Sequence, residues 1–363
     1  MGNIYQSTCT VIPPHMQRHI AEYGDDDDRE RILATLHHTS SISRGREATF
    51  ISTPTRSKDP QKRRYVYDAR NGHTLPGRVV MTERKESTKE VEAREAFQGS
   101  GATHDFFYKV FGRNSIDGKG MRMVSTIHYE RNFNNAMWTG RQMVYGDGDG
   151  KRFNRFTVAK DVIGHEFTHG VTQFTSGLEY HGQTGALNEH ISDVCGIMIK
   201  QRWLAQTVTQ SDWEIGRGLF TSEVNGTALR SMKAPGTAYD DPVLGRDPQP
   251  AHMRDYVVTT DDNGGVHINS GIPNHCFFLS ATRLGGHSWE VAGLLWFVAS
   301  TENLTPKAQF QDLANATVML AGKKFGVGGH VQTILIQSWS DVGLHVSSAF
   351  TKGVGGTSTL AAF

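Results

Sequence analysis

This sequence of 363 residues is poor in cysteine, in net charge and in long apolar runs. Its cysteines, Cys9, Cys195 and Cys276, are odd in number and scattered along the chain, which argues against a disulfide framework. The formal net charge of +1 gives no electrostatic reason to expect nucleic acid or an anionic membrane as a partner. The longest apolar run, residues 291–299, is far too short to span a bilayer.

The N-terminus also lacks a basic region followed by an apolar core, so the sequence predicts no secretory signal peptide. Internal repeats and low-complexity tracts are missing as well. These absences fit synthesis in the cytosol, and the length fits one large domain or two of medium size.

What the sequence does contain is a His-Glu-Phe-Thr-His motif. On a helix His165 and His169 share one face, so both imidazoles can bind one metal ion. Glu166 projects beside that ion, where its carboxylate can hold a water molecule that the metal has acidified. Glu189 and Asp193 are again four residues apart on a later helical stretch. Glu189 can supply a third ligand, and Asp193 can accept a hydrogen bond from the free ring N–H of a ligating histidine. Three protein ligands leave a fourth position open, which is typical of a catalytic zinc site.

The alternative for this motif is a surface helix whose histidines are merely solvated. Val162, Phe167 and Val171 favour burial of a helix predicted over residues 164–176, because they supply the apolar positions that would pack against a core. A histidine pair on a buried helix is energetically costly unless it has partners. The sequence therefore favours a metal site.

Five further motifs occur in order along the chain, at residues 134–138, 143–150, 176–180, 228–232 and 262–271. With the histidine motif they make the chain resemble the thermolysin-like zinc peptidases from about residue 65 to about residue 344. A short N-terminal segment containing Ile-Pro-Pro-His-Met at 12–16 resembles the protealysin subgroup, which has a compact pro-segment.

The resemblance implies an α+β, two-lobed thermolysin-like fold. We expect a pro-segment at residues 1–60, a strand-rich lobe at 61–176 that ends in the zinc-binding helix, and a helical lobe at 177–363. Strands are predicted at 65–67 and 123–129. Helices are predicted at 103–110 and from Thr305-Pro306 to about Gly326.

The resemblance assigns His165, His169 and Glu189 as zinc ligands and Glu166 as the general base. Zinc lowers the pKa of its bound water towards roughly 7, so that Glu166 can take a proton from that water and later deliver it to the leaving amine. His190, next to Glu189, is expected to point away from the ligand face and to be solvated or hydrogen-bonded.

Further roles are implied by the resemblance alone. Tyr180 and His267 would donate hydrogen bonds to the oxyanion of the tetrahedral intermediate, and Asp262 would orient and charge His267. Asn188 and Asp193 would hold the second ring nitrogens of the ligating histidines.

Substrate contacts follow from the same resemblance. Asn135 and Ala136 match the strand edge along which a peptide adds as an extra strand, and Arg230 matches the arginine that binds the substrate carbonyl after the scissile bond. Five apolar residues match the pocket for the substrate side chain after the scissile bond: Phe153, Phe156, Val162, Ile215 and Leu229. The alternative is that these residues simply pack in the core. Such a pocket implies cleavage before bulky hydrophobic residues.

Calcium is where the chain departs from thermolysin. Asp161, Asp212 and Glu214 match positions of its double calcium site. Two glutamates of that site are replaced here, by Lys200 and Arg217. Two cationic side chains cannot coexist there with both metal ions, so we expect the Lys200 ammonium to take their place. Calcium remains possible, but at fewer sites than in thermolysin.

Two other positions bear on calcium. Thr227 replaces an aspartate of another calcium site. The Asp-Gly-Asp-Gly sequence at 147–150 lacks the carboxylate that an EF-hand needs at its twelfth position, where Val158 stands, so we expect a tight turn between two strands.

In the N-terminal segment, the acidic run at 25–28 is expected to be the solvated start of a short helix near 29–36. By resemblance, Pro14, His15 and Met16 would plug the active-site cleft and keep the enzyme latent. From the residues alone, the Pro-Pro pair could equally be an extended linker.

The sequence thus predicts a zinc-dependent neutral endopeptidase made as a latent precursor. We expect peptide and protein substrates, the chain's own pro-segment as inhibitor, and a monomer. The resemblance implies secretion by leaderless export, with a cytoplasmic enzyme as the alternative. Other functions left open are a zinc-binding pseudoenzyme, an adhesive protein and an oligopeptidase confined to short peptides.

Overall fold

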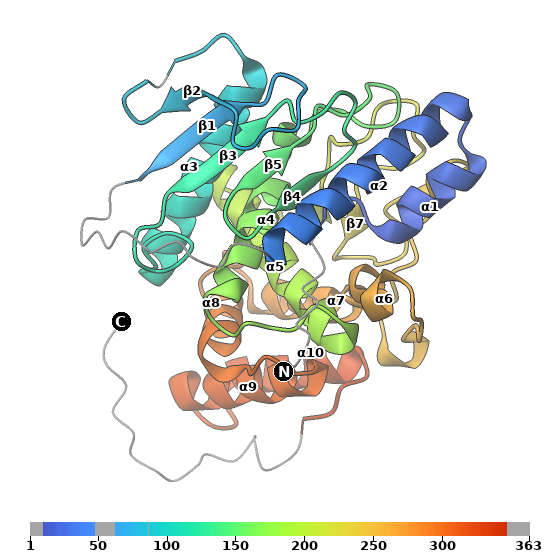
Figure 1. The fold of residues 1–363 in the computed structure, drawn as a ribbon. Coiled ribbons are helices and arrows are strands. Elements are labelled where there is room, and N and C mark those ends of the chain that lie inside the picture. Colours follow the sequence, from blue (N-terminus) through green and yellow to red (C-terminus); the bar gives the residue numbers. More distant parts are fainter. Residues whose placement is uncertain (1–9, 48–61, 86, 347–363) are drawn as a thin grey trace.

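The structure, a computed structural model, describes residues 10–47, 62–85 and 87–346. A sheet with its covering helix forms one lobe and a group of helices forms the other, with two long helices between them (Figure 1). This is the α+β, two-lobed architecture that the sequence analysis predicted. Within the described ranges no helix is long and apolar enough to cross a membrane.

The first lobe contains a five-stranded sheet in the order β2-β1-β3-β5-β4. Its strands are β1 (Arg64–Asp68), β2 (Arg78–Thr82), β3 (Met123–Ile127), β4 (Ala136–Trp138) and β5 (Met143–Tyr145). β3 runs parallel to β1 and β5, whereas the β1–β2 and β4–β5 pairs are antiparallel. β4 is therefore an edge strand of this sheet, and its unpaired side can accept another strand.

Helix α3 (Val91–Phe111) packs on this sheet and on the central helix α4 (Lys160–Gln173). It is much longer than the helix predicted at 103–110, because alanines and phenylalanines from Ala93 onwards continue the buried face towards the N-terminus. It ends at Gly112, whose φ of 67° is the left-handed conformation common at helix C-termini.

The central helices are α4 (Lys160–Gln173) and α5 (Gly182–Trp203), which pack closely on each other. Glycine is required at their contact, since a Cβ atom on Gly196 would lie 2.5 Å from the Asp161 carbonyl oxygen. α4 starts before the predicted residue 164 and ends before 176, since the chain turns after Gln173 and the Gly177 amide bonds to the Thr172 carbonyl.

The second lobe consists mainly of helices packed around Trp296 and Trp339, whose rings stack 5.7 Å apart. They are α6 (Asp262–Asn269), α7 (Gly271–Leu284), α8 (Ala292–Val298), α9 (Phe310–Phe325) and α10 (His330–Asp341). Two short hairpin-like pairs lie between α5 and α6, namely β6 (Glu214–Ile215) with β7 (Arg230–Ser231) and β8 (Asp240–Asp241) with β9 (Gly245–Arg246).

The predicted start of α9 at Thr305-Pro306 is wrong. Thr305 and Ala308 close a turn, and the helix begins at Phe310, where Gln309 and Asp312 form a capping box. The end at Gly326 is confirmed.

The N-terminal segment forms α1 (Pro14–Tyr23) and α2 (Asp26–Glu47), drawn in dark blue in Figure 1, and α1 contacts β9. Pro14 is the first residue of α1, so the linker alternative for the Pro-Pro pair is wrong. α2 is far longer than the predicted helix at 29–36. The prediction that the whole acidic run is solvated is also wrong, because the Asp28 side chain is only 1% exposed and pairs with Arg152 and Lys151.

Candidate metal centre and the surrounding site

The two central helices bring the predicted metal ligands together. His165 and His169 lie one turn apart on α4, and their Nε2 atoms are 3.0 Å apart. Glu189 on α5 places Oε2 3.3 Å from His165 Nε2 and Oε1 3.5 Å from His169 Nε2. All three side chains are buried. Three ligand atoms therefore converge on one point between α4 and α5.

The second ring nitrogens of both histidines are held by α5. Asp193 Oδ1 lies 2.8 Å from His165 Nδ1, and Asn188 Oδ1 lies 2.8 Å from His169 Nδ1. Both oxygens accept, so each Nδ1 carries the proton and each Nε2 presents a lone pair to the centre. These contacts are the ones that the sequence analysis expected for Asp193 and Asn188.

Two imidazole lone pairs this close together repel each other unless a cation lies between them. Burial lowers the pKa of His169 to about 3, so this ring is neutral at pH 7. Glu189 Oε2 is buried and has no hydrogen-bond partner among the described residues. Two nitrogens and a carboxylate oxygen are the donor set that zinc prefers, so these residues fit zinc.

Glu166 follows the first histidine and faces the same centre. Its Oε2 accepts a hydrogen bond of 2.7 Å from the Trp138 amide, at the end of β4. Its Oε1 is buried without a hydrogen-bond partner within the described structure. Burial raises the pKa of Glu166 to about 8, and the nearby Glu189 carboxylate acts in the same direction. A carboxylate in this environment can hold and release a proton near neutral pH.

Tyr180 and His267 lie on the other side of the ligand Glu189. The Tyr180 hydroxyl donates to Glu189 Oε1 and lies 3.3 Å from His267 Nε2, which is 3.6 Å from the same Glu189 oxygen. Both side chains are buried. The structure therefore brings two predicted oxyanion donors to the metal centre, although 87 residues separate them in the sequence.

A kinked loop at the start of α6 positions His267. Asp262 and Asn263 have φ angles of 51° and 52°, and this left-handed turn lets Asp262 accept from the His267 amide at 2.8 Å and from its Nδ1 at 2.6 Å. Burial lowers the pKa of His267, but the charge of Asp262 outweighs it and raises the pKa to about 9. His267 therefore carries a proton on Nε2 at neutral pH and can donate it in a hydrogen bond.

Arg230 on β7 bonds to Asp193 rather than to solvent. Its Nε and Nη2 atoms lie 2.9 and 2.8 Å from the two Asp193 oxygens, and Asn274 donates to Asp193 as well. Nη1 is buried and lacks a hydrogen-bond partner in the part of the chain that is described. Arg230 thus orients His165 through Asp193 and retains one unused donor atom.

The five residues predicted to line the apolar pocket are all buried in the main hydrophobic core: Phe153, Phe156, Val162, Ile215 and Leu229. Val162 lies one turn before His165 on α4, and the Leu229 amide donates to the Ile215 carbonyl beside Arg230. This places the apolar group next to the metal helix and β7. Their role as a substrate pocket stays a prediction.

The N-terminal segment lies along the strand edge predicted to receive substrate. Thr10 pairs with Met137 in an antiparallel bridge, and the Val11 amide donates to the Ala136 carbonyl at 3.1 Å. The Ile12 amide donates to Asn135 Oδ1 at 3.0 Å. Peptide backbone from the pro-segment therefore adds to β4 as an extra strand.

The residues predicted to plug the cleft follow directly. Pro14 starts α1, Met16 is fully buried, and His15 Nε2 lies 3.0 Å from the Tyr239 hydroxyl. Burial lowers the pKa of His15 to about 4, so its ring is neutral at pH 7.

His190 lies away from the metal ligands as predicted, and of the two expected alternatives it is hydrogen-bonded and not solvated. It is fully buried and bonded to Asn274 Oδ1 and Trp296 Nε1, each at 2.8 Å. The Trp138 amide and Tyr239 were not identified from the sequence. The backbone N–H of residue 138 carries no side-chain signal, and a lone tyrosine is more commonly a packing residue.

The predicted position of Lys200 is confirmed. Its Nζ lies 3.3 Å from Asp161, 2.8 Å from Asp212 and 2.6 Å from the Glu214 carbonyl oxygen. Arg217 pairs with Glu214 at 3.1 Å. Cationic side chains therefore neutralise these carboxylates from within the chain.

The two other positions discussed for calcium are also engaged within the protein. Thr227 Oγ1 donates to Glu214 Oε1 at 2.7 Å. In the 147–150 segment, Asp149 Oδ1 accepts from the amides of residues 151–153, which forms the expected tight turn. A short 3-10 helix, η1 (Phe156–Val158), follows this turn instead of the expected second strand.

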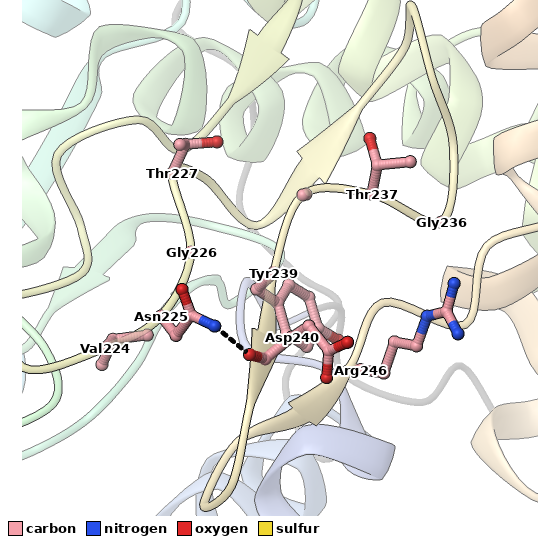
Figure 2. A pocket seen from close by; sticks show the side chains of 10 residues that line it. Val224, Asn225, Gly226, Thr227, Gly236, Thr237, Tyr239, Asp240 and Arg246 are labelled. Atoms are coloured by element: carbon pink, nitrogen blue, oxygen red, sulfur yellow. Dashed lines mark hydrogen bonds between the residues drawn. The ribbon is translucent and has the colours of Figure 1, made fainter.

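A separate surface hollow of about 550 Å³ lies between the 224–227 and 236–240 segments (Figure 2). A hydrogen bond of 2.6 Å from Asn225 Nδ2 to the Asp240 carbonyl oxygen joins these segments. The hollow contains none of the predicted metal-binding or catalytic residues. Tyr239, which lines this hollow, is the partner of His15 in the N-terminal segment.

Three known families match successive parts of this chain. Residues 9–46 match the protealysin propeptide, residues 46–173 match the catalytic domain of thermolysin metallopeptidases, and residues 176–344 match their alpha-helical domain.

Curated relatives and a solved structure agree with these matches. An extracellular metalloprotease of Pectobacterium carotovorum subsp. carotovorum is 46% identical over 349 residues, which cover 94% of this chain and 98% of the relative. Protease PrtS of Photorhabdus sp. (strain Az29) is 40% identical, with 93% and 92% covered. The solved precursor of protealysin, a metalloproteinase from Serratia proteamaculans, is 46% identical and has a TM-score of 0.85, with 93% of this chain and 99% of that chain covered.

Proposed function

Because this chain belongs to the thermolysin family of metallopeptidases and carries a protealysin-type propeptide, we propose that it is a zinc-dependent neutral endopeptidase made as a latent precursor. The observation that carries the proposal is the convergence of His165, His169 and Glu189 on one point, with Glu166 beside it. When bound there, zinc supplies a Lewis acid that acidifies water and polarises a carbonyl group.

The surrounding residues would carry the protons and the developing charge. Glu166 takes the proton of the attacking water on Oε1, its unpaired oxygen, while the Trp138 amide fixes Oε2. The same carboxyl group then delivers the proton to the leaving amine. Tyr180 and the protonated His267 donate hydrogen bonds to the oxyanion that forms on the substrate carbonyl.

We further propose cleavage on the N-terminal side of bulky hydrophobic residues. Phe153, Phe156, Val162, Ile215 and Leu229 would form the pocket for the side chain after the scissile bond. Arg230 supports this orientation, because its backbone pairs with Ile215 in the β6–β7 pair and its Nη1 donor has no hydrogen-bond partner among the described residues, so that it is available for a substrate carbonyl. Asn135 and Ala136 would hold the peptide as an added strand.

Latency follows from the same edge. Residues 10–12 already pair with β4, and α1 continues from them with His15 and Met16 packed inwards. A peptide substrate and the pro-segment would compete for the same backbone donors and acceptors. We also propose that the enzyme acts outside the cell, as the name of the Pectobacterium relative says of that protein.

The test is an assay of purified protein on casein and on a quenched peptide with Leu or Phe after the scissile bond. Activity should be lost with a zinc chelator and in Glu166→Ala, which should still bind zinc. A peptide with Asp at the same position should be cleaved far more slowly.

Other outcomes would point elsewhere. Zinc binding without turnover, with and without the pro-segment, would support a pseudoenzyme. Cleavage of the peptide but never of casein would support an oligopeptidase. Cleavage before acidic and hydrophobic residues alike would remove the proposed role of the apolar pocket.

A further inference from the structure

A second group of metal-binding side chains lies at the contact between the pro-segment and the strand-rich lobe. His38 comes from α2, while His73 and Glu130 come from two loops beside the sheet. One ligand atom of each lies within 4.8 Å of the other two. His38 Nε2 is 3.4 Å from Glu130 Oε2, and His73 Nδ1 also contacts that oxygen.

The two loop residues are held in place independently of α2. The Glu130 amide donates to the Gly72 carbonyl at 3.2 Å, and the Asn71 amide donates to the His128 carbonyl at 2.8 Å. These bonds tie the loop that carries His73 to the loop that carries Glu130. Two of the three side chains are therefore present on the catalytic lobe before the pro-segment contributes His38.

The arrangement of the three side chains is poorly explained by hydrogen bonding. Glu130 Oε2 is buried and approached by two imidazole nitrogens, yet it has no partner with hydrogen-bond geometry among the described residues. The His38 and His73 rings stack 4.5 Å apart, with the Tyr129 ring edge-on to both. A cation bound by the three side chains would satisfy the buried oxygen and both nitrogens at once.

From this geometry we propose that His38, His73 and Glu130 bind a second divalent metal ion, of the zinc class, that fastens the pro-segment to the catalytic lobe. Two imidazole nitrogens and one carboxylate oxygen are a donor set suited to zinc, with the fourth position left to water. The His73 side chain is 59% exposed, so its ring can turn to bring Nδ1 and His38 Nε2 onto one ion without disturbing the core.

Docking of the pro-segment on the catalytic lobe would therefore depend on the metal ion. α2 docks nearby through a hydrogen bond of 3.2 Å from the Asn134 amide to Thr35, one turn of helix before His38. An ion bound to His38 would add a coordinate bond between the pro-segment and the enzyme. Removal of the pro-segment would remove one of three ligands and release the ion. Ion binding itself does not depend on peptidase activity, so it can be tested without turnover.

The experiment uses the full-length precursor with Glu166→Ala, which keeps the chain intact. Zinc is added, loosely held metal is removed by gel filtration, and the bound metal is counted by elemental analysis. We expect two zinc ions per chain, and one in the same protein with His73→Ala or His38→Ala. Losing a direct ligand should weaken the second ion by at least about 100-fold, since even outer partners of ligands contribute 10- to 100-fold.

His287→Ala is the matched control. His287 also pairs with a carboxylate, that of Glu290, but this surface pair contains only one histidine. It should leave the count at two. Zinc should also raise the unfolding temperature of the control more than that of the His73→Ala protein. A count of one zinc in all the proteins would overturn the proposal and leave a plain histidine–carboxylate contact. A count of two that survives both His38→Ala and His73→Ala would place the second ion elsewhere and overturn it equally.

Discussion

His267 Nε2 lies 3.2 Å from the carbonyl oxygen of Thr10, a residue 257 positions earlier in the chain. The group proposed to stabilise the substrate oxyanion thus donates a hydrogen bond to the pro-segment backbone. Thr10 also pairs with Met137 on the strand edge. The pro-segment therefore contacts both the proposed oxyanion donor and the strand edge proposed to bind substrate, two contacts through which a short segment would block the site.

Removing an oxyanion donor should slow the reaction without removing the metal. We expect Tyr180→Phe and His267→Ala each to lower kcat/KM of the mature enzyme by about 100-fold or more, since a lost donor has this effect in other hydrolases. Tyr108→Phe, an exposed tyrosine on α3, should leave kcat/KM unchanged. Steady-state kinetics with parallel zinc analysis checks this, and unchanged rates with full zinc content would show that neither group contacts the oxyanion.

Acid should loosen the pro-segment through His15. The ordinary pKa of histidine is 6.5, and burial lowers that of docked His15 to about 4. The released segment therefore binds more protons, so docking is strongest above pH 6.5 and weakens as the pH falls towards 4. Between pH 7 and pH 5 the loss should be about 2 kcal/mol.

Hydrogen exchange of the α1 amides in the Glu166→Ala precursor measures this docking. The opening free energy should fall between pH 7 and pH 5 in that protein. It should stay nearly constant when His15→Gln is added, since glutamine does not titrate. An equal pH dependence in both proteins would assign the effect to another group.

The buried ion pairs of Asp28 should anchor α2. Asp28 lies 2.9 Å from Arg152 and 3.0 Å from Lys151, and its side chain is 1% exposed. Asp28→Asn leaves two cations without their buried partner, so docking of α2 should weaken by about 3 kcal/mol. Asp27→Asn, at a 71% exposed position in the same turn, is the control and should cost less than ~0.5 kcal/mol. Faster maturation of the Asp28→Asn precursor alone is the expected readout, and equal rates for both variants would contradict this role.

Lys200 should stabilise the second lobe where thermolysin uses calcium. Lys200→Met leaves the buried carboxylate of Asp161 without its cation, and we expect a loss of about 3 kcal/mol in the free energy of unfolding. Lys307→Met, at an 80% exposed position, should change it by less than ~0.5 kcal/mol. Urea unfolding measures both. Added calcium should leave the wild-type midpoint unchanged, and a strong calcium-dependent increase would show that the site still binds the ion.

The metal centre was accessible from the sequence because helix geometry is local. Residues four apart share a helix face, so His165 and His169 predict each other, as do Glu189 and Asp193. Their oxygen and nitrogen donors then fit only a few kinds of ion. The same local rule explains why helix boundaries were less accurate, as at α9, where the Gln309 cap competes with the Thr305-Pro306 signal.

Contacts between distant segments could not be read in this way. The sequence by itself predicted the candidate metal ligands, because these depend on residue type and short-range spacing, and its motifs indicated the fold family and the pro-segment through their resemblance to known proteins. Only the tertiary structure decided that the Trp138 amide holds Glu166, that Thr10 reaches His267, and that His38 meets His73 and Glu130. Each of these contacts depends on how separate elements pack, and packing is set by the whole chain at once.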